Sequence, residues 1–241
     1  MSAGRANQIL VGLFTPGAAN GLDSELPGLL VRACAGTLSI TGAGLISMTS
    51  KGPLGILAAT DGPAGILEEL QFTLGEGPCI DASVSRRPVL QPELGRTGYS
   101  RWPGFTAGAL EAGVKAVFAF PLQVGGIRIG VLDLYRDAEG DLGNGELVEA
   151  LAFADAAVSV LLHLQAEAGP DNIHPALLSG VMSRSEVHQA TGMLSAQHGV
   201  SLAQALLMLQ GRAYSSDRPI LDIARDVLAR RLKLGNEVAG D

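Results

Sequence analysis

Hydrophobic positions in the first two thirds of the chain form short runs separated by turn residues. Gly, Pro or Asp bounds most of these runs, which is typical of strands. The predicted strands are residues 38–48, 56–59, 88–91, 116–122 and 128–135. Gly125 and Gly126 separate the last two, and a glycine pair between two strand-like runs indicates a hairpin. Residues 26–38 have helical spacing. This pattern predicts an antiparallel sheet with flanking helices.

Residues 144–168 have the spacing of one long helix with two apolar stripes. The first stripe is Leu147, Leu151, Ala154, Val158 and Leu161. The second stripe is Ala150, Phe153, Ala157, Val160 and Leu164. One stripe can cover the sheet, and the other needs a partner. We therefore expect this helix to pack against its copy in a homodimer; burial inside one monomer is the alternative.

The last part of the chain predicts three short helices after the linker-like sequence GPDNIHP. The first is expected to begin near Ser183 or Ser185 and to end at His198, before Gly199. The second begins at Ser201, where Ser-Leu-Ala-Gln forms a capping box, and runs to about residue 214. The third begins near residue 219, where a proline suits a first helical turn, and ends before residue 235. One apolar stripe on each helix predicts a compact three-helix unit.

These elements divide the chain into an α+β part followed by an all-α part. The expected divisions are a flexible N-terminal segment 1–24, a sheet domain 25–168 that includes the long helix, a linker 169–182, a helical domain 183–234 and a tail 235–241. A length of 241 residues suits two modest domains.

Composition indicates a cytoplasmic protein. No uninterrupted apolar run reaches the roughly 18 residues that a membrane span needs, and no cleavage site follows the apolar residues 9–14. The formal net charge is −7. From Asp171 onward, seven basic residues balance seven acidic ones, so the front of the chain carries the whole negative charge. Basic residues exceed acidic ones only slightly between Arg184 and Lys233, which alone does not identify a nucleic-acid binder.

Residues with catalytic potential are few. The four histidines are scattered, with no cysteine or carboxylate at metal-ligand spacing, so we expect no metal and no cofactor. The sequence GEGP at residues 75–78 is no phosphate loop, because a proline stands where the helix should open and no Gly-Lys-Ser/Thr follows. Cys34 and Cys79 are expected to be reduced thiols packed in the core.

Gly192 stands inside the helical sequence VHQATGMLSAQHGVS at residues 187–201. A glycine inside a helix costs about 1 kcal/mol relative to alanine, so another requirement should retain it. A small residue would permit a close helix crossing, but Gly192 lies off the apolar stripe that includes Ala190. Alternatively, its missing side chain would let another backbone or a planar base approach the helix.

The sequence VHQATGMLSAQHGVSLAQALLMLQGRAYSSDRPILDIARDVLARR, at residues 187–231, resembles the ANTAR domain of bacterial transcription antiterminators. The matching positions are Ala190, Gly192, Ala205, Leu209, Ala213, Ile223 and Ala224. The resemblance implies binding to paired RNA hairpins with small terminal loops. The residues that it places near RNA are Arg184, His188, Gln189, Thr191, Gly192, Arg212, Tyr214 and Arg218. A solvated face for the arginines, and a core edge for Tyr214, are the alternatives.

The preceding segment, residues 26–168, resembles a GAF domain through LGEGPCIDA at residues 74–82, RWPGF at residues 101–105 and the hairpin FPLQVGGIRIGVLDLY. GAF domains are sensors, so the resemblance implies a signal-gated protein without naming the signal. Cys79 and Trp102 are candidates for a ligand pocket, and core packing is the alternative for both. The signature of cyclic-nucleotide-binding GAF domains is not evident.

These observations favour a homodimeric GAF–ANTAR regulator that is not an enzyme and that acts by transcription antitermination. Some GAF domains are similar to free methionine sulfoxide reductases, so a thiol redox enzyme that uses Cys79 is one alternative. Such chemistry normally needs a second cysteine, and only Cys34 is available. A protein-binding scaffold without RNA affinity is the other alternative.

Overall fold

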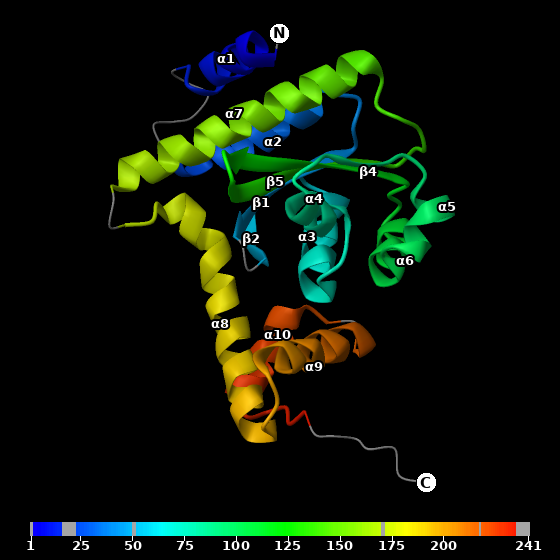
Figure 1. Cartoon of the computed structure of the whole chain (residues 1–241), viewed down its shortest axis with the longest axis vertical. Helices are drawn as coiled ribbons and strands as arrows, with labels where there is room; N and C mark the ends of the chain where they lie inside the picture. The colour runs from blue at the N-terminus through cyan, green and yellow to red at the C-terminus, as the bar shows by residue number, and fades with distance from the viewer. Residues whose placement is uncertain (1, 16–22, 50–51, 170–171, 217, 235–241) are drawn as a thin grey trace.

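The computed structural model describes residues 2–15, 23–49, 52–169, 172–216 and 218–234, apart from the side chains of residues 2, 3, 178–184 and 203. One sheet lies between two helical layers, and a separate group of helices lies below the second layer (Figure 1). We call the part from α1 to α7 the sheet domain, and α8 to α10 the helical unit. The α+β class predicted from the sequence is confirmed.

The sheet has five strands, all paired antiparallel in the order β2-β1-β5-β4-β3. The strands are β1 Gly42–Thr49, β2 Gly52–Ala59, β3 Val89–Gln91, β4 Ala116–Val124 and β5 Ile127–Arg136. Each lies where the hydrophobic runs predicted a strand. The β4–β5 hairpin turns at Gly125 and Gly126, and Gly125 has the positive φ of 57° that favours glycine.

Helices α2 Leu26–Thr37 and α7 Asn144–Ala168 cover one face of the sheet, and α1 Ser2–Leu13 packs on the outer side of α7 (Figure 1). The expectation of a flexible segment 1–24 was wrong for its first half, because α1 is a helix that packs on α7. Its residues Ala6, Ile9 and Leu13 join the core, and this spacing places them on one helix face. The glycine-rich residues 16–21, which belong to the same expected segment, lie outside the described residues.

The two stripes of α7 are buried to different extents. All residues of the second stripe are buried inside the chain. In the first stripe Ala154 and Leu161 are buried, Leu147 and Val158 are half-buried, and Leu151 is 38% exposed. By length and composition α7 could cross a membrane, but 50% of its most apolar stretch is buried, as in a core helix of a soluble protein.

Helices that the hydrophobic runs did not reveal cover the other face. They are α3 Pro63–Leu74, α4 Pro78–Ser85, α5 Leu94–Thr97 and α6 Pro103–Glu111, with short 3-10 turns at Asp23–Glu25 (η1) and Gly98–Ser100 (η2) elsewhere in the domain. Each of α3, α4 and α6 starts at a proline. Proline suits a first helical turn because a backbone N–H at that position would have no intrahelical partner, so nothing is lost when proline lacks one. Pro78 therefore opens a helix, contrary to the interpretation of GEGP above. The missing Gly-Lys-Ser/Thr still argues against a phosphate loop.

The helical unit consists of α8 Pro175–His198, α9 Leu202–Ser215 and α10 Ile220–Leu228 around a core of their apolar stripes. The predicted start of α8 at Ser183 or Ser185 was wrong, because the helix already begins at Pro175 and its first part runs beside β2. The end of α8 at His198, the bounds of α9 and the start of α10 agree with prediction, and α10 ends before residue 235 as expected. Gly199 ends α8 at a φ of 63°, and at the start of α9 the N–H groups of Ser201 and Gln204 donate to each other's side chains at 3.0 and 3.2 Å.

Candidate nucleic-acid interface

The candidate residues on α8 differ in exposure. His188 and Gln189 are exposed, whereas Thr191 is only 5% exposed and its hydroxyl donates to the carbonyl of Val187 at 2.7 Å. Thr191 therefore belongs to the side of α8 that faces the other helices in this conformation. Arg184 lies on the same helix, but its side chain lies outside the described residues.

Gly192 has open space around it. A Cβ built at this position meets no described heavy atom within 4 Å outside its own helix. The crossings between helices instead use alanines that are fully or almost fully buried, among them Ala190, Ala205 and Ala224. Close helix packing within this chain therefore does not explain Gly192. Its position three residues after Gln189 places both on the same side of α8.

The candidate residues on α9 and beyond are exposed, and one of them is ion-paired. Tyr214 is 61% exposed and Arg212 is also exposed. The guanidinium of Arg218 contacts the carboxylate of Asp226 at 2.7 Å, and Arg231 contacts the same carboxylate at 2.8 Å. The hydrogen bond from Arg218 lowers the pKa of Asp226, with a second contribution from Arg231.

Part of the helical unit faces the sheet domain. Phe72 on α3 packs against the core of the helical unit, and the Gln210 amide on α9 lies against Gly75 at the end of α3. Tyr214 and Arg218 line a groove of about 470 Å³ opposite α3 and α6. His188 lines a different cavity, whose walls include Phe72 and Gln210. The candidates are therefore not gathered on one free surface.

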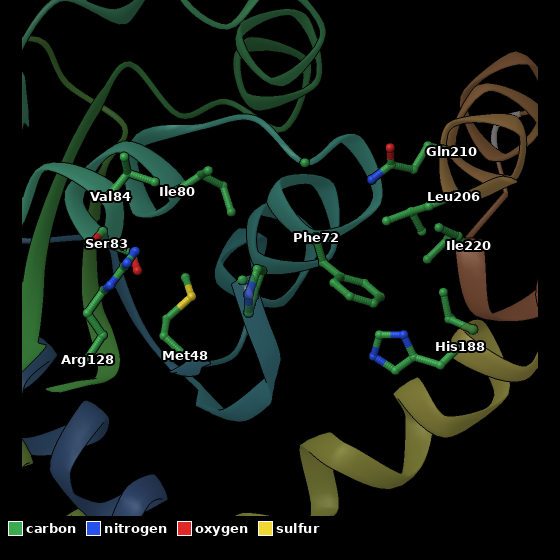
Figure 2. A pocket seen from close by; sticks show the side chains of 14 residues that line it. Met48, Phe72, Ile80, Ser83, Val84, Arg128, His188, Leu206, Gln210 and Ile220 are labelled. Carbon is green, nitrogen blue, oxygen red and sulfur yellow. Dashed lines mark hydrogen bonds between the residues drawn. The ribbon is translucent and has the colours of Figure 1, made fainter. Parts of the chain in front are cut away.

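The cavity beside His188 has a volume of about 360 Å³ and takes its walls from both parts of the chain. Met48, Phe72 and Arg128 come from the sheet domain, and His188 and Leu206 come from the helical unit (Figure 2). No motif pointed to this cavity, because it forms where segments that are distant in sequence meet.

Both candidates for a ligand pocket in the sheet domain are core residues. Cys79 is 1% exposed and Trp102 is 2% exposed, and neither lines the two spaces described above. The Cys79 backbone N–H donates to the Gln71 side-chain oxygen at 2.8 Å, and the indole of Trp102 donates to Asp81 at 3.2 Å. Core packing, the alternative stated above, describes both positions in this conformation.

The two cysteines lie in separate core clusters on opposite faces of the sheet. Cys34, on α2, packs with the α1–α2–α7 layer, and Cys79, on α4, packs with the α3–α4–α6 layer. They form no disulfide with each other. Burial also raises the pKa of the Cys34 thiol, which disfavours the reactive thiolate. Cys34 is therefore not placed to resolve an oxidised Cys79.

Two buried carboxyl groups form a polar network in the sheet domain that sequence reasoning missed. Glu68 on α3 and Asp133 on β5 are both fully buried and are hydrogen-bonded to each other. The Tyr135 hydroxyl donates to Glu68 at 2.7 Å, and the Gln71 amide donates to Asp133 at 2.9 Å. Burial raises the pKa of both carboxyl groups, and the charge of Asp133 raises that of Glu68 further.

A protein-family model decides the identity of the helical unit. The model of the ANTAR domain matches residues 177–228. The helical unit is an ANTAR domain. It begins earlier than residue 183, in agreement with the early start of α8. No curated protein sequence matches the chain.

Solved structures identify the fold of the sheet domain. The chain is similar to the GAF domain of an Acinetobacter phosphoenolpyruvate-protein phosphotransferase, with a TM-score of 0.50 and 11% identity over 69% of this chain and 96% of that one. The corresponding domain from Coxiella burnetii has a TM-score of 0.49 and 14% identity, over 69% of this chain and 98% of that one. A free methionine-R-sulfoxide reductase from Thermoplasma acidophilum has a TM-score of 0.45 and 13% identity, over 58% of this chain and 92% of that one. The likeness to the Acinetobacter domain defines a GAF fold, and at 11% identity it defines no activity.

The chain thus joins a GAF fold to an ANTAR domain, an architecture that indicates a regulator more than an enzyme. All the candidate RNA residues lie inside the matched ANTAR segment. What the sequence did not reveal is that His188, Tyr214 and Arg218 face the GAF domain. The apolar Phe72 on the ANTAR side of α3 was the available signal for this contact, but an apolar residue on a helix more often belongs to its own domain's core.

Proposed function

We propose that this chain is a cytoplasmic, signal-responsive regulator that binds RNA through its ANTAR domain and acts by transcription antitermination. The observation that carries the proposal is the ANTAR match at residues 177–228, together with a closed core formed by all three helices of that segment. The GAF domain, residues 25–168, would sense a signal and dimerise. The RNA would be a pair of hairpins with small terminal loops, whose stabilisation prevents a terminator from forming.

The RNA face would be centred on α8. Gln189 is exposed, and Gly192 leaves open space beside it, so a base could approach the helix backbone there. Arg212 is exposed on α9 and would contribute charge. Recognition of an RNA loop depends on stacking and a few hydrogen bonds, so the modest positive charge of this segment is sufficient.

Release of the ANTAR domain would be part of the mechanism. His188, Tyr214 and Arg218 also belong to the proposed RNA-binding set, yet they line spaces that face the GAF domain. Full RNA binding would then require the two domains to separate. A signal that changes the GAF domain would act by shifting the equilibrium between docked and separated forms.

Dimerisation would use the exposed side of α7. Val148, Leu151 and Leu162 are large apolar residues of this helix that remain exposed. Their spacing gives one stripe along the helix, broken in the middle by Asp155 and Ser159. A second copy could cover this stripe, and two ANTAR domains in one dimer could bind two hairpins together.

The proposal is tested by selecting hairpin RNAs on the immobilised full chain and measuring read-through of a terminator that overlaps the selected hairpins. We expect saturable binding and read-through that rises with protein concentration. An ANTAR domain used only for protein contacts would give no binding above that of a scrambled RNA. Binding without any change in read-through would limit the function to RNA binding and refute antitermination.

A further inference from the structure

The cavity between the GAF and ANTAR domains has the features of a small-molecule site. We infer that it binds an amphipathic monocarboxylate, a molecule with an apolar body and one carboxylate. This site is separate from the buried region around Cys79 and Trp102, because neither of those residues lines it. The site itself requires no RNA, but its effect on RNA binding rests on the function proposed above.

The apolar body would lie along the middle of the cavity. Met48, Ile80 and Phe72 form the GAF side, and Leu206 and Ile220 form the ANTAR side (Figure 2). A volume of about 360 Å³ is within the usual range for small-molecule sites. Apolar walls of this kind favour the removal of an alkyl or aromatic group from water.

The carboxylate would bind to Arg128, at the end of the cavity beside Ser83 (Figure 2). Arg128 is half-buried, and its Nη1 donates to the Ser83 carbonyl at a long 3.3 Å. Among the described residues it forms no ion pair, and no Asp or Glu lines the cavity. A guanidinium without a carboxylate partner beside an apolar wall is complementary to a monocarboxylate, which it can bind through two hydrogen bonds.

The ANTAR domain completes the opposite end of the cavity with His188, Gln210 and the apolar Leu206. The cavity therefore exists in full only when the two domains are docked. A ligand that contacts both walls binds the docked form more tightly and stabilises it by mass action. It would thereby hold His188, Tyr214 and Arg218 against the GAF domain and weaken RNA binding.

Isothermal titration of the full chain with decanoate tests the site directly. We expect saturable binding of one decanoate per chain and no binding of decyltrimethylammonium, which has an alkyl chain of nearly the same length and the opposite charge. Arg128→Gln should weaken decanoate binding about tenfold or more, because a charge-assisted hydrogen bond is lost. Arg87→Gln, at an exposed arginine outside the cavity, should leave it unchanged. Absence of saturable binding, or equal binding to the Arg128→Gln chain, would overturn the proposal.

A second variant tests the contribution of the ANTAR wall. Leu206→Trp fills the apolar end of the cavity and should weaken decanoate binding about tenfold, since it displaces roughly two buried methylene groups. Unchanged affinity in this variant would place the ligand outside the cavity between the domains. With a selected hairpin, decanoate at a concentration near its Kd for the wild type should reduce the RNA affinity of the wild type and should reduce that of Arg128→Gln much less. If the chain binds decanoate as expected but binds no RNA, the site stands and the proposed function fails.

Discussion

The buried carboxyl pair Glu68–Asp133 is the most unusual arrangement at the scale of single residues. Two carboxyl groups can share a hydrogen bond only when one keeps its proton, and burial favours that neutral form. The backbone also makes room for the pair, because a Cβ at Gly44 would collide with the Glu68 carboxyl. With Tyr135 and Gln71 as donors, the network holds α3 against the middle of the sheet.

This pair predicts a pH dependence of stability. Because the pKa of Glu68 is raised in the folded chain, its stabilising contribution is complete below its unfolded pKa, near 4.3, and is lost as pH rises toward the folded value. Glu68→Gln cannot ionise and still donates to Asp133. We expect its free energy of unfolding to rise relative to that of the wild type as pH increases above the unfolded pKa. The gain is about 1.4 kcal/mol for each unit by which folding raises the pKa of Glu68, and it is followed by the melting temperature. Glu111→Gln, at an exposed site, is the control. A difference that is constant with pH would contradict this account.

Gly192 gives a prediction that separates stability from RNA binding. Because open space surrounds the position, Gly192→Gln should raise the free energy of unfolding by roughly 0.5–1 kcal/mol. Its side chain would exclude a base from α8 and should weaken hairpin binding about tenfold, the cost of about one stacked base. Melting curves and fluorescence anisotropy measure the two effects. Gly36→Gln, at an open helical glycine in the GAF domain, should leave RNA binding unchanged. Undiminished hairpin binding by Gly192→Gln would remove this position from the RNA face.

At the scale of elements, the strands and the long α7 could be predicted because their apolar runs are bounded by clear turn residues. Helices α3, α4 and α6 were missed because their stripes are weak, although an initial proline marks each start. Helix α1 was missed because a glycine-rich stretch follows it directly, and only its packing on α7 reveals its role. The start of α8 was predicted too late because the linker-like composition near residue 170 continues into its first turn.

The exposed stripe of α7 predicts how the chain assembles. Leu151→Glu combined with Leu162→Glu places charges on residues that are exposed in one chain, so each chain should fold normally while the dimer dissociates. Light scattering measures the mass and circular dichroism the fold. Leu207→Glu, at an exposed leucine on α9, should leave the dimer intact. A folded double variant that remains a dimer would assign the interface to another surface.

Val158→Glu should instead destabilise each chain, because Val158 packs against the core.

At the scale of the whole molecule, the contact between the domains was beyond sequence reasoning. Each domain has its own apolar core, and its pattern can be read from local spacing. The contact between Phe72 and the ANTAR core depends on how the long α8 directs the second domain back toward α3 (Figure 1). Candidate RNA residues could therefore be named from the ANTAR pattern, but not whether they are free.

Separating the two domains should increase RNA binding. Phe72→Ser removes the aromatic ring that packs on the ANTAR domain, so the docked form should lose stability. The GAF domain should then no longer stand opposite the exposed His188, Tyr214 and Arg218, and an RNA could approach them. We expect a larger radius of gyration by small-angle scattering and a severalfold higher hairpin affinity. Leu90→Ser, at an exposed leucine on β3, is the control. An expanded chain with unchanged or lower affinity would refute the inhibitory role of docking.

Crosslinking in the native host tests RNA binding by the ANTAR domain most directly. The tagged chain would be crosslinked to RNA with ultraviolet light, and both the RNA and the crosslinked peptides would be sequenced. We predict peptides within residues 177–228, and RNAs that share paired hairpins next to a terminator, with recovery strongly reduced for Gly192→Gln. Recovery of RNA no greater than from an untagged strain, or crosslinks confined to the GAF domain, would contradict the account.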